Sequence, residues 1–140
     1  MISPLWLAAA MLVAPAPATA SPWFGTWSLR LKSADEKPET LVYSDAGGGA
    51  MRMVSVEQNS IIVTRFDGRP APNEGTKTEK VQTLAITAET PTRYRWTFAL
   101  DGKPWVAGVN TLAADRKTFT EVSWLVAKPA NTVTLVYERR

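Results

Sequence analysis

The sequence contains no histidine and no cysteine among its 140 residues. Without histidine, the chain lacks the commonest general base and the commonest metal ligand. Without cysteine, it has no thiol nucleophile, no thiolate metal site and no disulfide. These absences favour a protein with no bound cofactor or metal and no catalytic activity. They also mean that packing and strand pairing alone must hold the fold together.

Carboxylates are the main catalytic candidates that remain, and most of them fall at predicted turns, where exposure to solvent is their ordinary role. Glu121 is the exception, because it lies in the middle of a predicted strand between Phe119 and Ser123. It is either an inward-facing acid with a raised pKa or a residue on a solvated face. If the protein is an enzyme, Glu121 is its best candidate, although no catalytic motif surrounds it.

Basic character is mild, with a formal net charge of +3. Residues 93–98, Arg-Tyr-Arg-Trp-Thr-Phe, interleave basic and aromatic side chains, as single-strand nucleic-acid platforms do. In a strand, however, successive side chains alternate between faces, so the arginines and the rings would be separated. We therefore predict that nucleic acid is not a partner.

The N-terminal residues are typical of an export signal. An apolar run over residues 5–13 is followed by two prolines and a small-x-small sequence at 18–20. We predict a cleaved signal peptide at 1–20, a domain at 21–140 that is periplasmic or secreted, and no membrane span after cleavage. The start of the chain carries no lysine or arginine, and initiation at Met11 would instead give a cytoplasmic protein.

Apolar and polar residues alternate in short segments along the rest of the chain. In 23–31, Trp27, Leu29 and Leu31 share one face, which predicts a half-buried strand. Similar patterns bring the total to about nine strands; the other segments are 39–45, 50–57, 60–67, 80–88, 93–100, 105–112, 118–127 and 132–139. No helical repeat persists after residue 20.

Short turns between these segments favour up-and-down order, in which neighbours in sequence pair in the sheet. The predicted fold is all-β, a single antiparallel β-barrel of about 8–9 strands, with a β-sandwich as the runner-up. An even strand number would let the ends pair antiparallel, so one segment is expected to be split or spurious, 105–112 being the weakest. The Pro/Gly-rich residues 67–75 are predicted to form a loop.

Several short sequences carry a family resemblance. Gly25-Thr26-Trp27 opens the first strand, and Tyr137-Glu138-Arg139 ends the last. Further positions that carry it are Tyr43, the glycines at 47–49, Phe66-Asp67-Gly68, Asp101-Gly102-Lys103 and residues 115–118. Together, these sequences resemble lipocalin-type small β-barrels, in particular small exported bacterial proteins of unassigned function. The resemblance implies that Trp27 packs under Arg139 or Arg140 and closes one mouth of the barrel. Gly25 leaves room for a close neighbour at the start of this strand.

The interior of such a barrel is either filled by side chains or holds one small ligand. Aromatic residues are spread over many strands, and we expect Trp96, Phe98, Trp124 and Tyr137 to line any pocket. The leading hypothesis is an exported barrel that binds a small apolar ligand. The alternative is a periplasmic or envelope interaction or inhibitor module that acts through its outer surface and residues 67–75.

Overall fold

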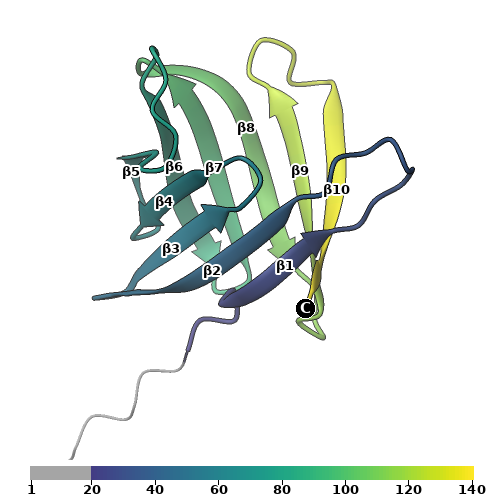
Figure 1. Ribbon diagram of the computed structural model, residues 1–140. Coiled ribbons are helices and arrows are strands. Elements are labelled where there is room, and N and C mark those ends of the chain that lie inside the picture. Colours follow the sequence, from purple (N-terminus) through teal and green to yellow (C-terminus); the bar gives the residue numbers. More distant parts are fainter. Residues whose placement is uncertain (1–19) are drawn as a thin grey trace, which may run out of the picture.

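The computed structural model describes residues 20–140. The predicted signal peptide at 1–20 lies, apart from Ala20, outside the described residues. The described chain forms one ten-stranded antiparallel sheet that curves into a nearly closed barrel (Figure 1). Its strands are β1 (Gly25–Leu29), β2 (Thr40–Gly47), β3 (Ala50–Ser55), β4 (Ser60–Thr64), β5 (Asp67–Pro72), β6 (Gln82–Thr90), β7 (Arg93–Leu100), β8 (Lys103–Leu112), β9 (Thr118–Leu125) and β10 (Thr132–Arg139).

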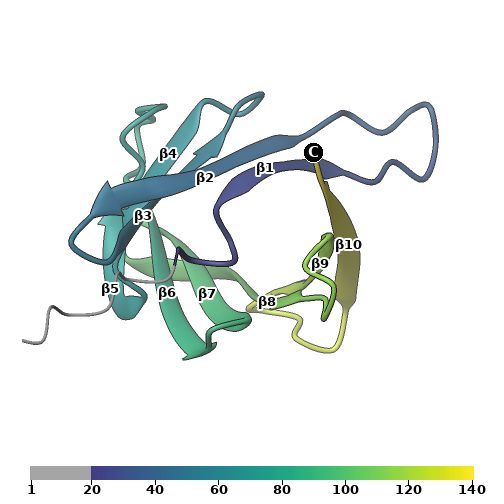
Figure 2. The same ribbon diagram turned by 90° about the horizontal axis from the view of Figure 1, so that it is seen from below.

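Strand order confirms the predicted all-β, up-and-down architecture. Hydrogen-bonded neighbours follow the order β4-β3-β2-β1-β10-β9-β8-β7-β6-β5, so the first strand pairs with the last. Seen from below, the strands form a ring in which β1 lies beside β10 (Figure 2). All strands belong to one sheet, so the runner-up β-sandwich is wrong. Within residues 20–140, no helix has the length and apolar character needed to cross a membrane.

Two sequence predictions about strands are wrong. Residues 67–75 are mostly not a loop, because Asp67–Pro72 forms β5 and pairs with β6 through Pro70, Ala71 and Pro72. Proline cannot donate to a ladder, but it is tolerated on an edge strand, and β5 is at one end of the sheet order. The segment 105–112 is not spurious either, since it forms most of the 10-residue strand β8.

The barrel closes between β4 and β5, where the sheet order ends. The Ile61 carbonyl accepts a hydrogen bond from the Glu74 amide at 2.8 Å, and the Ile61 amide donates to Asn73 Oδ1 at 3.0 Å. Gly75 approaches so closely that a Cβ there would overlap the Asn59 carbonyl oxygen. The segment after β5 therefore fastens this side of the barrel to the start of β4, and it needs a glycine to do so.

One end of the barrel is filled by aromatic side chains. The fully buried Phe119 ring lies between Trp27, with centroids 4.9 Å apart, and Tyr137, with centroids 4.7 Å apart. Trp23 folds under the sheet, where its carbonyl accepts a hydrogen bond from Trp27 Nε1 at 3.0 Å. Its own Nε1 donates to the Pro91 carbonyl at 3.1 Å. The chain preceding β1 thus closes the end of the barrel nearest the C-terminus.

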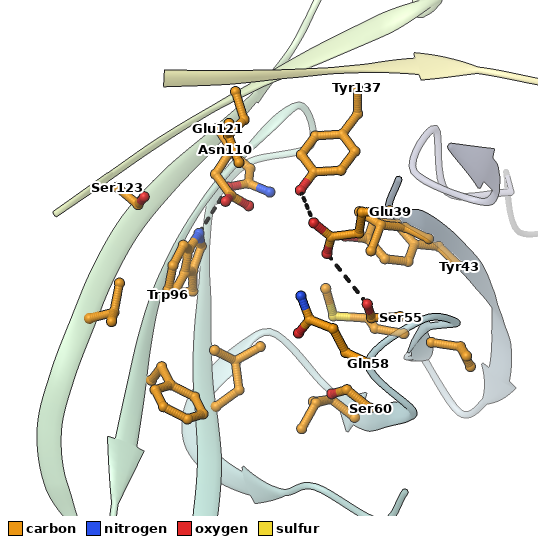
Figure 3. Close-up of a pocket in the computed structure, with 18 of the residues that line it drawn as sticks. Glu39, Tyr43, Ser55, Gln58, Ser60, Trp96, Asn110, Glu121, Ser123 and Tyr137 are labelled. Carbon is orange, nitrogen blue, oxygen red and sulfur yellow. Dashed lines mark hydrogen bonds between the residues drawn. The ribbon is translucent and has the colours of Figure 1, made fainter. Parts of the chain in front are cut away.

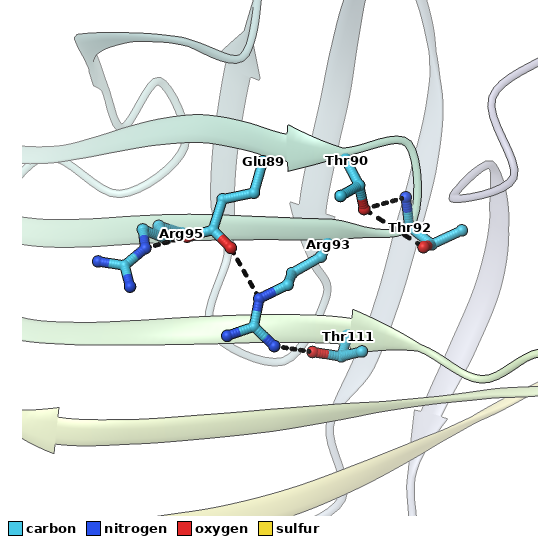
Figure 4. Close-up of polar contacts among 6 residues, drawn as sticks. All are labelled: Glu89, Thr90, Thr92, Arg93, Arg95 and Thr111. Atoms are coloured by element: carbon cyan, nitrogen blue, oxygen red, sulfur yellow. Dashed lines mark hydrogen bonds and ion pairs between the residues drawn. The ribbon is translucent and has the colours of Figure 1, made fainter.

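The outer face of β6 and β7 carries a charged network (Figure 4). The Glu89 carboxylate accepts hydrogen bonds from Arg93 Nε, at 2.7 Å, and from Arg95 Nε. These hydrogen bonds hold the pKa of Glu89 below its usual value, the Arg95 bond contributing most. Tyr94, between the two arginines, is buried inside the barrel. The alternation predicted for this strand is therefore present, with arginines outside and rings inside.

Candidate functional site

The other end of the barrel is hollow and contains a cavity of about 490 Å³ (Figure 3). Apolar side chains from strands around the barrel form part of its wall: Leu41, Met53, Val54, Ile62, Leu84, Trp96, Phe98, Val106 and Leu135. Polar side chains form the remainder: Glu39, Tyr43, Ser55, Gln58, Ser60, Tyr94, Asn110, Glu121, Ser123 and Tyr137. The cavity therefore combines a hydrophobic surface with a set of converging polar groups.

A glycine gives Trp96 its position in this wall. Gly108 on β8 is the cross-strand partner of Trp96 on β7, and a Cβ at Gly108 would overlap the indole ring. The ring therefore lies across the glycine. Its Nε1 donates a hydrogen bond to Asn110 Oδ1 at 2.8 Å. A bulkier residue at 108 would push the ring out of this place.

Asn110 links two of the aromatic side chains. It is only 2% exposed, and its Nδ2 donates to the Tyr94 hydroxyl at 2.9 Å. Both ends of its amide are thus engaged, one with Trp96 and one with Tyr94. Burial raises the pKa of Tyr94 well above the usual value, so its hydroxyl stays protonated. This rigid group supports the cavity wall where the hollow part meets the aromatic core.

A second polar group connects β10 with the residue before β2. The Tyr137 hydroxyl donates to Glu39 Oε2 at 2.9 Å, and Ser55 Oγ donates to Glu39 Oε1 at 3.4 Å. Tyr137 stacks on Phe119 at an interplanar angle of 14°, so its ring belongs to the core while its hydroxyl reaches the cavity. Burial, followed by the charges of Glu121 and Glu39, raises the pKa of Tyr137. Glu39 is thus held in a fixed place by two neutral donors.

Glu121 faces the cavity from β9, so the inward alternative is the one that the structure shows. Burial raises the pKa of its carboxyl to about 7; the nearby charge of Glu39 adds to this shift, and Asn110 opposes it. A carboxyl with such a pKa changes its charge near neutral pH. It can donate a hydrogen bond when protonated, and it can accept one or pair with a cation when ionised.

Three of the predicted pocket residues, Trp96, Phe98 and Tyr137, line the cavity. Trp124, the fourth predicted residue, is not among the lining residues. It directly follows Ser123, which faces the cavity, and neighbouring residues of a strand point to opposite faces. Trp124 therefore lies on the outer face of β9, paired with Ala107.

The residues expected to close the barrel are brought together at its filled end. The Arg139 guanidinium carbon lies 4.1 Å from the centroid of the Trp27 ring. Arg139 also donates to the Phe24 carbonyl at 2.6 Å and to the Pro22 carbonyl at 2.7 Å. A Cβ at Gly25, whose φ is +139°, would press on this guanidinium. This cluster is separate from the cavity, and Arg139 rather than Arg140 makes the contact.

Sequence reasoning missed Glu39, Asn110 and Gly108. Asn110 carried a usable signal, because it is an even number of residues from Val106 on the same strand, and both side chains face inward. Gly108 is on the same face of the strand, and a glycine there marks a position where a ring from the neighbouring strand can lie. Glu39 carried a similar signal, because it begins the predicted strand 39–45 and alternates in step with Leu41 and Tyr43, which also line the cavity. Its hydrogen bond to Tyr137, 98 residues away in sequence, had no local signal.

No protein-family model matches the chain, and no curated protein matches it.

Proposed function

We propose that this protein is an exported, lipocalin-like carrier that binds one small molecule with an apolar body in the cavity. The observation that carries the proposal is the contrast between the two ends of the barrel. One end is packed with aromatic rings, while the other holds a pocket of about 490 Å³ that opens to solvent.

Size and chemistry of the cavity support this proposal. Small-molecule pockets are typically about 300–1,000 Å³, mostly apolar, with a few polar groups that fix orientation. Burial of apolar ligand surface against Leu84, Phe98 and Leu135 would supply most of the affinity, at about 25 cal/mol per Å². Glu39, fixed by Tyr137 and Ser55 and able to accept further hydrogen bonds, would orient the polar part of the ligand.

Export and family likeness are part of the same proposal. The signal-like residues at 1–20 support export, and the contact between Trp27 and Arg139 supports the lipocalin-like assignment. Expression of the full chain in a bacterial host, followed by fractionation and mass measurement, tests export. The expected product is periplasmic and begins at Ser21. A full-length cytoplasmic product would contradict export without bearing on the cavity.

Titration of medium-chain alcohols into the purified protein, followed by calorimetry, tests binding. We expect saturable binding with a stoichiometry near one. Ser123→Trp fills the cavity and should abolish binding, whereas Val122→Trp adds the same ring on the opposite face of β9 and should not. Absence of binding over a broad panel of apolar compounds would contradict the carrier proposal, as would equal binding by both variants.

The second candidate is an envelope interaction or inhibitor module. A group of large, exposed apolar side chains supports this candidate. They lie near the end of the barrel where β8 and β10 begin and β9 ends, and they are Trp105, Leu125, Val126 and Val133. Because residues 67–72 are a paired edge strand, this patch rather than 67–75 would be the contact surface. Pull-down from periplasmic extract with a Trp105→Ser control tests it. A partner lost in the variant would favour this function over the carrier.

A further inference from the structure

Charge in the cavity is of one sign. Among the described residues that line it, two are carboxylic acids, Glu39 and Glu121, and none is lysine or arginine. Tyr137 and Ser55 donate hydrogen bonds to Glu39, but these donors are neutral and leave its charge uncompensated. The cavity therefore presents a negative potential to anything that enters it.

The two acids come from different elements and converge on the same space. Glu39 precedes β2, whereas Glu121 is in the middle of β9, and the charge of one affects the other. Figure 3 shows both carboxyl groups directed into the cavity, beside the Tyr137 ring. An ionised carboxylate that is largely removed from water is unfavourable unless it is paired. A bound cation would provide the missing partner.

Aromatic rings form part of the same cavity wall. Trp96, Phe98 and Tyr94 all line it from β7, and Trp96 and Tyr94 are fixed through Asn110. Organic cations bind favourably against aromatic faces, tryptophan above all, as well as to carboxylates. The cavity therefore offers three features that suit one class of molecule: an apolar wall, aromatic faces and uncompensated negative charge.

From this arrangement we infer that the ligand is an organic cation, an amine with an apolar body whose ammonium group pairs with Glu121 and Glu39. The inference rests on the proposed carrier function and specifies the class of its ligand. A carboxylate with the same body would be repelled by the two acids. A neutral alcohol would bury the same apolar surface without the charge interaction.

Three probes with the same tail, octylammonium, octanol and octanoate, test this at pH 8 by isothermal titration calorimetry. Octylammonium should bind about tenfold or more tightly than octanol, because a charge-assisted hydrogen bond adds at least a factor of this size. Octanoate should bind most weakly. Glu121→Gln should reduce octylammonium affinity more than octanol affinity and so narrow the gap between the two ligands, with Glu39 retaining part of the preference for the cation. Glu79→Gln, an exposed acid outside the cavity lining, should change neither.

The outcomes separate this inference from the carrier function. Octanol binding as tightly as octylammonium, or tightest binding of octanoate, would overturn the organic-cation inference and leave the carrier in place. Equal loss of both ligands in Glu121→Gln would overturn it as well, and Glu39→Gln repeats the measurement with the second acid. Absence of binding by all three probes would overturn the inference and count against the carrier.

Discussion

The Arg139 guanidinium lies over the indole ring of Trp27, with 4.1 Å between the guanidinium carbon and the ring centroid. The two residues are cross-strand partners, so this contact joins the last strand to the first. The same guanidinium donates hydrogen bonds to the Pro22, Phe24 and Arg116 carbonyls. One side chain therefore holds the closing turn before β1, the β8–β9 connection and the β1–β10 pair together.

Arg139→Ala should destabilise the fold by about 2–4 kcal/mol, because it removes the cation–π contact and the hydrogen bonds to the three carbonyls. The neighbouring Arg140→Ala is the matched control. Arg140 is exposed, and its contact with Thr26 uses only its backbone amide. Urea denaturation of both variants measures the difference. Equal effects of the two substitutions would contradict this role for Arg139.

Only part of this closing contact could be predicted from local pattern. Alternation over 23–31 places Trp27 inward. The arginine over its ring follows only from the resemblance to lipocalin-type barrels, which does not decide between Arg139 and Arg140. Strand 67–72 was not predictable in the same way, since its glycine and prolines are ordinary loop residues. Only the edge position of β5 makes them compatible with a strand.

The candidate site was predictable only where alternation decides it. Trp96 and Phe98 follow from the β7 pattern, and the same rule excludes Trp124, which differs in parity from Glu121 and Ser123. Alternation with Leu41 and Tyr43 is consistent with an inward Glu39, but its hydrogen bond to Tyr137 depends on long-range pairing between β1, β2 and β10, which no local pattern encodes. The hollow end itself results from the sum of side-chain volumes across the barrel, so no short stretch of sequence reveals it.

Gly75→Ala should open the seam between β4 and the segment after β5, because the added methyl group would overlap the Asn59 carbonyl oxygen. We expect a loss of about 1–3 kcal/mol in stability. Amide hydrogen exchange at Glu74, which donates to the Ile61 carbonyl, should accelerate. Lys77→Ala, an exposed neighbour, should leave both quantities unchanged. Unchanged exchange at Glu74 in Gly75→Ala would show that the seam does not depend on this glycine.

Gly108→Ala should displace the Trp96 ring and break its hydrogen bond to Asn110. The expected cost is about 1–3 kcal/mol, together with a changed near-ultraviolet circular dichroism signal. Ala107→Ser, the preceding position on the opposite face of β8, serves as control. A native-like spectrum of Gly108→Ala would contradict the packing described for Trp96.

Glu121 should make stability depend on pH between about 4.5 and 7. Its pKa is raised to about 7 in the folded protein from an ordinary value of 4.5, so over this interval the folded state binds more protons than the unfolded state. The contribution of Glu121 to stability should therefore be fully present at pH 4.5 and below and be lost as pH rises to about 7, by roughly 3 kcal/mol at most. The chain has no histidine, which would otherwise titrate in this range.

Glu121→Gln isolates this contribution in denaturation series at several pH values. The variant should be more stable than the wild type at pH 8 and about equal to it near pH 4.5. Glu79→Gln should retain the wild-type pH profile. A Glu121→Gln profile parallel to that of the wild type would show that the carboxyl is not desolvated in the cavity.

The central claim is that the hollow end of the barrel holds a small molecule, and fluorine NMR of protein labelled with 5-fluorotryptophan tests it most directly. Trp96 lines the cavity, whereas Trp105 is exposed and Trp124 lies on the outer face. On titration with octylammonium or octanol, the Trp96 resonance should shift saturably while those of Trp105 and Trp124 stay in place. Shifts confined to Trp105 or Trp124, or no shift of Trp96 at saturating ligand, would contradict the claim.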